Sequence, residues 1–126
     1  MEFYLTTTLD ELQAGNEALG SRTVLAVKKI IETEYRHELS LHQIAEKVFL
    51  TASYLSKLFK HETGGTITEY MTMVRINKAK ELLKNNRNLK TYEVGEFVGY
   101  TDSSYFNKLF KKEVGVTPKE YRDHVM

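Results

Sequence analysis

Two stretches of this chain are nearly identical: residues 53–60 read SYLSKLFK and residues 104–111 read SYFNKLFK. The likeness extends upstream, where IAEKV at 44–48 matches VGEFV at 94–98. It extends downstream too, where Glu62, Gly64, Thr66, Glu69 and Tyr70 match Glu113, Gly115, Thr117, Glu120 and Tyr121. The offset between the copies grows from 50 to 51 residues, so the second copy is one residue longer after its turn. Such self-similarity predicts one structural unit built twice.

The local signals in both copies are those of helices. Thr8 begins a capping box whose helix would stop at Gly20, and two further capping boxes stand at 40–43 (SLHQ) and 117–120 (TPKE). Thr51 and Thr101 are expected to cap the two nearly identical helices. Gly64 is a left-handed stop, and Pro118 suits the first position of the last helix. Caps, stops and apolar spacing predict helices over 8–20, 24–36, 40–48, 52–63, 66–85, 91–98 and 102–114, and a last one from Thr117.

The order of these helices predicts the fold. Each copy is a short helix, a turn of three or four residues and a longer helix, which is the plan of a helix-turn-helix unit. No segment alternates with period two, so we expect an all-α protein with about seven helices and one extra N-terminal helix. The expected organisation is an acidic N-terminal segment or linker (1–22), a first helix-turn-helix unit (23–65), a long linking helix (66–85) and a second helix-turn-helix unit (86–126).

The repeated helix has two different faces. Leu55, Leu58 and Phe59 share one side, and the other side is small, polar and cationic. The second copy repeats this division, with Phe106, Leu109 and Phe110 inside. Short polar side chains and lysines are what a helix in the major groove of DNA requires, and the helix start offers amides to a phosphate. A solvated face of a helical bundle is the alternative for one helix alone, but the duplicated pattern favours DNA.

The charge distribution agrees with a nucleic-acid partner for most of the chain. The net charge is only +1, but residues 1–20 hold four acidic side chains and no Lys or Arg. Setting them aside leaves 18 basic against 13 acidic side chains over residues 21–126. The repeated part is therefore modestly basic.

From about Val24 to Val125 the sequence resembles the DNA-binding domain of the AraC/XylS family of bacterial transcription regulators. The stretches SLHQIAEKVFLTASYLSKLFKHETG, VRINKAKELL and VGYTDSSYFNKLFKKEVGVTPKEYR carry the resemblance. They resemble output domains of response regulators more than small stand-alone activators. The resemblance implies sequence-specific binding of double-stranded DNA, with two recognition helices in successive major grooves.

The resemblance also implies roles for particular residues. The base-contacting candidates are Ser53, Ser56, Lys57, Ser103, Ser104, Asn107 and Lys108. The phosphate-contacting candidates are Thr51, Lys60, His61, Thr101, Lys111 and Lys112. Arg75 matches a recurrent arginine of the linking helix and could make a structural ion pair or a DNA contact. Tyr70 and Tyr121 are expected to pack.

Two positions depart from the pattern. Gly95 stands where the family usually has alanine, which lowers helix stability by about 1 kcal/mol and predicts a looser second unit. Phe49 stands in the first turn where the second copy has Gly99, so the two turns need not be superimposable.

Catalytic interpretations have little support in the sequence. The chain has no Cys, and neither His37-Glu38 nor His61-Glu62 has the second histidine of a zinc-protease motif. His42 and His124 have no ligand-spaced partner, and Gly64-Gly65 is explained as a helix stop rather than a phosphate loop. We therefore expect no enzyme activity, no metal site and no cofactor. The remaining alternative is a helical protein-protein interaction module without DNA binding.

The expected partners and location follow from these points. No stretch approaches the ~18 apolar residues of a membrane span, and we expect a cytoplasmic protein without a membrane partner. RNA polymerase, and a sensory or receiver domain that this chain lacks, are candidate protein partners. The chain is expected to be either a stand-alone regulator or the C-terminal portion of a longer protein.

Overall fold

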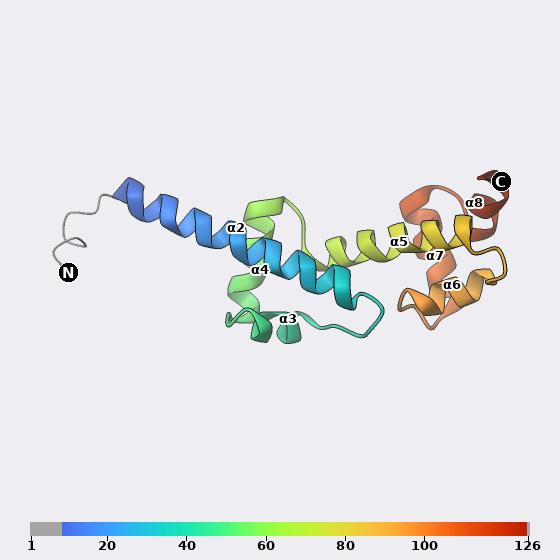
Figure 1. Ribbon diagram of the computed structural model, residues 1–126, viewed down its shortest axis with the longest axis horizontal. Helices are drawn as coiled ribbons and strands as arrows, with labels where there is room; N and C mark the ends of the chain where they lie inside the picture. The colour runs from blue at the N-terminus through green and yellow to red at the C-terminus, as the bar shows by residue number, and fades with distance from the viewer. Residues whose placement is uncertain (1–8, 126) are drawn as a thin grey trace. The chain divides into compact units, whose positions relative to one another are not determined.

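The computed structural model describes the backbone of residues 9–125 and the side chains of residues 19–125. This part forms seven helices and no strand: α2 (Leu9–Glu34), α3 (Leu41–Lys47), α4 (Ala52–Thr63), α5 (Ile67–Asn85), α6 (Thr91–Phe97), α7 (Ser103–Val114) and α8 (Pro118–His124) (Figure 1). The predicted all-α class is confirmed. The described residues up to Ile30 and Ser40–Ile67 form one compact unit, unit 1, and Ile31–Leu39 with Thr68 onward form a second, unit 2.

The N-terminal helix corrects one prediction. α2 runs without a break through Gly20, where a helix stop was expected. Gly20 is buried, and a Cβ there would lie 3.1 Å from Leu58 Cδ1 and 3.1 Å from Glu62 Oε1 of α4. This glycine therefore allows α2 to approach α4 closely inside unit 1, and it does not end the helix. Thr8, the expected N-cap, lies outside the described residues.

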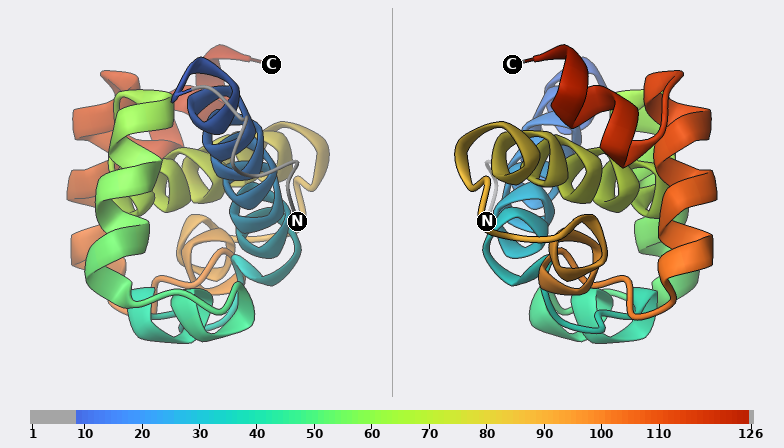
Figure 2. Two further views of the ribbon diagram at one scale, coloured as in Figure 1. Left: turned by 90° about the vertical axis from the view of Figure 1, so that its left-hand side faces the viewer. Right: turned by 90° about the vertical axis from the view of Figure 1, so that its right-hand side faces the viewer.

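In unit 1, α3 leads into α4 across a short turn, and the two helices pack together (Figure 2). The predicted caps are confirmed: Ser40 and Gln43 form the capping box of α3, and Thr51 Oγ1 accepts from the Tyr54 amide at the start of α4. Gly64 ends α4 with φ of 83°. The buried apolar side chains of unit 1 are Val24, Val27, Ile44, Ala45, Leu55, Phe59 and Ile67.

The turns of the two helix-turn-helix units have the same backbone hydrogen bonds. The Phe49 and Leu50 amides donate to the carbonyls of Glu46 and Ala45, as the amides of residues 99 and 100 do to those of residues 96 and 95. Phe49 reaches this geometry with φ of 59°, although its ring is 93% exposed. A side chain in that region costs roughly 1–2 kcal/mol. The expected difference in composition is therefore accommodated by strain rather than by another turn.

Unit 2 has its own core, to which α5, α6 and α7 contribute. Its buried members are Ile76, Ala79, Leu83, Val94, Val98, Phe106 and Phe110. Tyr121 of α8 packs edge-on against Phe110 with ring centroids 5.7 Å apart, as its position predicted. Tyr70 is partly buried, and its hydroxyl lies 2.7 Å from Glu32 Oε1.

A glycine is required at position 95 by the packing of the unit 2 core. A Cβ at this position would lie 2.7 Å from Phe106 Cδ2, closer than real Cβ contacts allow. The corresponding residues of unit 1 are Ala45 on α3 and Leu55 on α4, which are both buried. Ala45 is larger than Gly95, and Leu55 is smaller than Phe106. The phenylalanine of the second unit therefore uses the volume that the missing methyl leaves.

Two arginines of unit 2 hold the C-terminal ends of helices. Arg75 Nε and Nη2 donate to the carbonyls of Tyr35 (2.8 Å) and His37 (3.0 Å), just after α2. Arg122 of α8 donates to three carbonyls at and after the end of α5, those of Leu83, Asn86 and Leu89. A planar guanidinium suits donation to several carbonyl acceptors at once. Arg75 is therefore structural, with backbone carbonyls in place of the carboxylate of an ion pair.

Candidate nucleic-acid interface

The outer face of α4 is exposed to solvent along the whole helix. Leu55 and Phe59 are buried, while all the candidate DNA contacts of this unit are exposed: Thr51, Ser53, Ser56, Lys57, Lys60 and His61. The two serines lie in the first half of the helix, and the basic side chains follow from Lys57, at its middle, to His61. A helix with this division can bring its backbone close to base edges and still reach phosphates.

α7 of unit 2 presents the corresponding face. Phe106 and Phe110 are buried, and the predicted contacts of this unit are all exposed: Thr101, Ser103, Ser104, Asn107, Lys108, Lys111 and Lys112. The structure thus gathers the predicted residues of each unit on one helix face.

The start of α7 differs from the prediction. Thr101 was expected to cap it, but the helix begins at Ser103 and its N-cap is Asp102. Asp102 Oδ1 accepts from the amides of Ser104 (3.0 Å) and Tyr105 (3.1 Å). The extra residue of the second copy moves the cap by one position, so Asp102 and not Thr101 corresponds to Thr51. A carboxylate here occupies amides that a phosphate would otherwise use, and it repels that phosphate.

Two exposed aromatic residues of these helices were missed by the sequence reasoning. Tyr54 of α4 is 55% exposed and Tyr105 of α7 is 54% exposed. They occupy the same place in the repeat, 51 residues apart. The repeat itself was the available signal, because the division into core and outer residues had assigned neither tyrosine.

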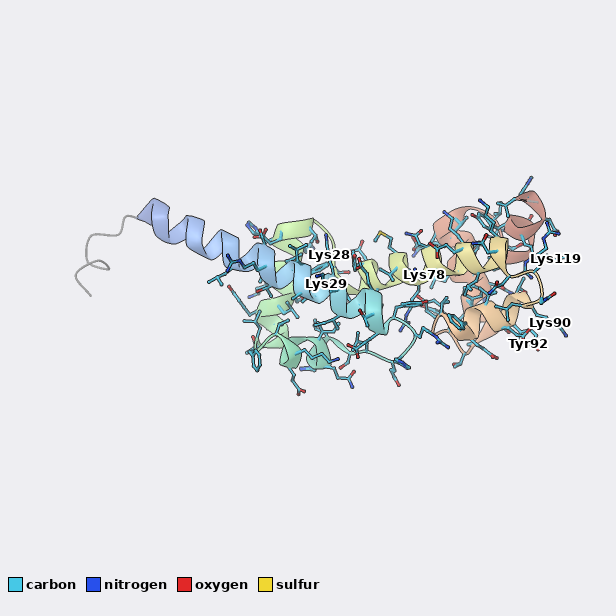
Figure 3. All side chains as sticks on the ribbon, in the orientation of Figure 1. Lys28, Lys29, Lys78, Lys90, Tyr92 and Lys119 are labelled. Atoms are coloured by element: carbon cyan, nitrogen blue, oxygen red, sulfur yellow. The ribbon has the colours of Figure 1, made fainter. Side chains whose placement is uncertain are left out.

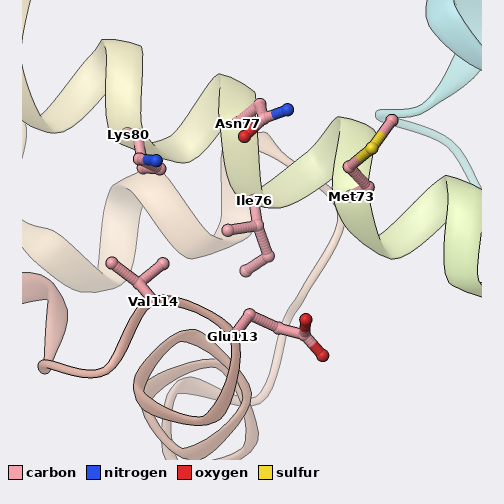
Figure 4. A pocket seen from close by; sticks show the side chains of 6 residues that line it. All are labelled: Met73, Ile76, Asn77, Lys80, Glu113 and Val114. Atoms are coloured by element: carbon pink, nitrogen blue, oxygen red, sulfur yellow. The ribbon is translucent and has the colours of Figure 1, made fainter.

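Several open clefts lie elsewhere among the described residues. A shallow cleft of about 230 Å³ lies in unit 2 between α5 and the end of α7, lined by Met73, Ile76, Asn77, Lys80, Glu113 and Val114 (Figure 4). No group of three or more potential metal ligands occurs among the described residues. In the same part of the chain, no helix is long and apolar enough to cross a membrane.

Comparisons with known proteins agree with this geometry. A family model described as a helix-turn-helix domain matches residues 44–124. The Msm operon regulatory protein of Streptococcus mutans is 38% identical over 99 residues, which cover 79% of this chain and 35% of that protein.

Two solved structures are also similar. One is the C-terminal domain of the two-component response regulator YesN of Fusobacterium nucleatum (40% identity, TM-score 0.72, 76% of this chain and 93% of that one). The other is the C-terminal domain of the response regulator AraT of Geobacillus stearothermophilus (34% identity, TM-score 0.79, 82% and 86%).

The fold and the exposed helix faces define a double helix-turn-helix module of the kind found in DNA-binding transcription regulators. The chain belongs to the AraC family of bacterial transcription regulators. It spans about a third of the length of the curated relatives that it matches.

Proposed function

We propose that this chain binds double-stranded DNA with sequence specificity by placing α4 and α7 in two successive major grooves. The observation that carries the proposal is the duplicated helix face, in which every predicted contact is exposed. In this arrangement Ser53, Ser56 and Lys57 of α4, and Ser103, Ser104, Asn107 and Lys108 of α7, read base edges.

Phosphate contacts complete the proposal and differ between the units. Thr51, Lys60 and His61 hold the backbone of the first half-site, and Lys111 and Lys112 hold that of the second. Thr101 precedes the Asp102 cap, so the start of α7 attracts a phosphate less than the start of α4 does.

The wider role of the protein extends this proposal. We assign residues 23–126 to DNA binding and residues 1–22 to a segment that links the domain to a receiver or sensory domain in a longer parent protein. RNA polymerase is the proposed partner in activation, and the cytoplasm is the proposed location. Relatives of similar sequence include the lactose operon transcription activator of Staphylococcus xylosus.

The first experiment is a salt titration of binding to duplex DNA. The logarithm of the affinity should fall linearly with the logarithm of the salt concentration, by about 0.9 for each phosphate neutralised. If no duplex is bound even at low salt, the chain is instead a helical protein-binding module and the proposal is wrong.

Variants separate base reading from phosphate binding once an operator has been selected from random duplexes. Lys57→Ala and Asn107→Ala should weaken operator binding by about 1–3 kcal/mol each and random-duplex binding much less. Lys112→Ala should weaken both equally and reduce the salt slope by about 1. An equal effect of Lys57→Ala on operator and random DNA would remove Lys57 from the base-reading set.

A further inference from the structure

Two tyrosines occupy equivalent, outward-facing places on the helices that read DNA. Tyr54 and Tyr105 each lie in the first turn of their helix and correspond to each other in the repeat. Both rings are more than half exposed, and an exposed aromatic ring gains nothing from burial in the core. Because both units leave an aromatic ring exposed at this position without the stabilisation of burial, the two rings are expected to have a role on the outer face.

The neighbours of these tyrosines indicate what that role is. Residues three and seven positions further along a helix lie on the same stripe. Tyr54 therefore shares a stripe with Lys57 and His61, and Tyr105 shares one with Lys108 and Lys112. Each stripe passes from a candidate base contact to a candidate phosphate contact, so each tyrosine lies at the flank of the reading face.

The phenol groups are chemically available. Neither hydroxyl has a hydrogen-bond partner among the residues that the structure describes. The Tyr54 amide is held by Thr51 Oγ1 and the Tyr105 amide by Asp102 Oδ1, so both residues are fixed to the N-terminal turn by their backbone. The Tyr105 ring also contacts Tyr100, with ring centroids 5.8 Å apart. A tyrosine hydroxyl is a recognised donor to phosphate oxygens.

We propose that Tyr54 and Tyr105 are a matched pair of uncharged phosphate contacts, one at each half-site, each donating its hydroxyl hydrogen to a backbone phosphate. This inference rests on the proposed DNA-binding function. An uncharged donor releases no counterion when it binds, so these contacts add affinity that does not depend on salt concentration. The Asp102 carboxylate makes the N-terminus of α7 a weaker phosphate site. The Tyr105 contact compensates for this and helps to hold α7 on the second half-site.

Removing the hydroxyl alone tests the pair. Tyr54→Phe and Tyr105→Phe keep the ring and should each lower the affinity roughly tenfold, as expected for a hydrogen bond to a charged group. The loss should be equal for operator and random duplex, and the salt slope should stay at the wild-type value. Tyr92→Phe is the matched control, because Tyr92 is 48% exposed and lies on α6, outside both reading helices (Figure 3). It should bind DNA as the wild type does.

A second measurement locates the phosphates. A series of operators is made in which one phosphate at a time is replaced by a neutral methylphosphonate. At one position in each half-site, this replacement should weaken binding of the wild type but should not further weaken binding of the matching phenylalanine variant. This lack of additivity is the signature of a direct contact.

The outcomes separate the two proposals. Wild-type binding by the double variant Tyr54→Phe/Tyr105→Phe, or a loss confined to the operator, overturns the tyrosine contacts and leaves the DNA-binding proposal intact. A wild-type chain that binds no duplex overturns the proposed function itself. Thermal unfolding of each variant, expected at the wild-type temperature, shows that a loss of affinity comes from the hydroxyl.

Discussion

At the scale of single residues, the two units solve the same packing problem in different ways. The matching positions are an alanine on α3 and a leucine on α4 in unit 1, and a glycine on α6 and a phenylalanine on α7 in unit 2. The space that Gly95 leaves for Phe106 is expected to offset the helix propensity that the glycine loses. The sequence contained this answer, since both pairs stand at matching positions of the repeat, but only the contact between Gly95 and Phe106 shows that they compensate.

A double-mutant cycle tests this compensation. Gly95→Ala should lower the free energy of unfolding by about 1–3 kcal/mol through overpacking against Phe106, less the ~1 kcal/mol that alanine gains in a helix. Phe106→Leu alone should leave a cavity and lower it by roughly 1–2 kcal/mol. The double variant restores the pair of unit 1, so it should be more stable than the sum of the single losses by at least ~1 kcal/mol in urea unfolding.

Additive losses in that cycle would contradict the compensation. Ala45→Gly in unit 1 provides the matched control, because Leu55 does not need the vacated volume. It should destabilise on its own, and Leu55→Phe, which recreates the pair of unit 2, should recover part of that loss.

At the scale of helices, what the sequence predicted well is what a few neighbouring residues decide. The capping boxes of α3 and α8, the N-cap of α4 and the left-handed stop at Gly64 are all local, and all are confirmed. Gly20 was misread because its partners lie on α4, about 40 residues away in sequence. Arg122 was missed for the same reason: its acceptors are carbonyls 33 to 39 residues away.

Within unit 2, the Tyr70 hydroxyl of α5 donates a hydrogen bond to Glu32 Oε1 near the end of α2. Burial, and then the hydrogen bond to Glu32, raises the pKa of Tyr70 to about 12. A folded-state pKa above the unfolded value of 10.0 means that the unfolded chain ionises first as the pH rises. The stability from this contact is complete below pH 10 and is lost as the pH rises toward about 12.

The raised pKa of Tyr70 predicts a loss of stability at high pH. The wild type should lose more stability than Tyr70→Phe between about pH 10 and 12, measured as urea midpoints at each pH. Ultraviolet absorbance should show a tyrosine that ionises at higher pH than the exposed ones. In Glu32→Gln this tyrosine should ionise at a lower pH than in the wild type, but still later than the exposed ones, because burial is the larger cause of its raised pKa. Parallel pH profiles of the wild type and Tyr70→Phe would show that the contact does not contribute to folding.

At the scale of the whole molecule, the two readers carry unequal charge. Residues 21–30 and 40–67, the part of unit 1 that carries its recognition helix, hold six basic and two acidic side chains, although residues 1–20 add four acidic ones to that unit. Unit 2 holds 12 basic and 11 acidic side chains. The recognition helix of unit 1 also starts with a neutral threonine, and that of unit 2 starts with an aspartate. Unit 1 should therefore supply most of the electrostatic affinity, while unit 2 adds selectivity at lower affinity.

Covalent linkage of two unlike readers predicts the form of the DNA site. Helix-turn-helix dimers bind half-sites about 34 Å apart, and α5 alone, with 19 residues, is ~28 Å long at 1.5 Å per residue. A single chain can then serve both half-sites. Because α4 offers Ser53 and Ser56 where α7 offers Ser104 and Asn107, the half-sites should differ and the whole site should not be a palindrome.

Inserting five base pairs between the half-sites tests this arrangement, because about half a helical turn moves one groove to the opposite side of the duplex. Affinity, measured by fluorescence anisotropy, should fall to that of one half-site. The charge difference identifies which one remains: footprinting should show the unit 1 half-site protected, and Lys57→Ala should weaken this residual binding while Lys108→Ala should not. An insertion of ten base pairs controls for length, because it returns both half-sites to the same side of the duplex but places them farther apart than the linking helix can reach. It should therefore also leave a single half-site bound. Undiminished binding after either insertion, or a symmetric site occupied only by two chains, would rule out a monomer that bridges two unlike grooves.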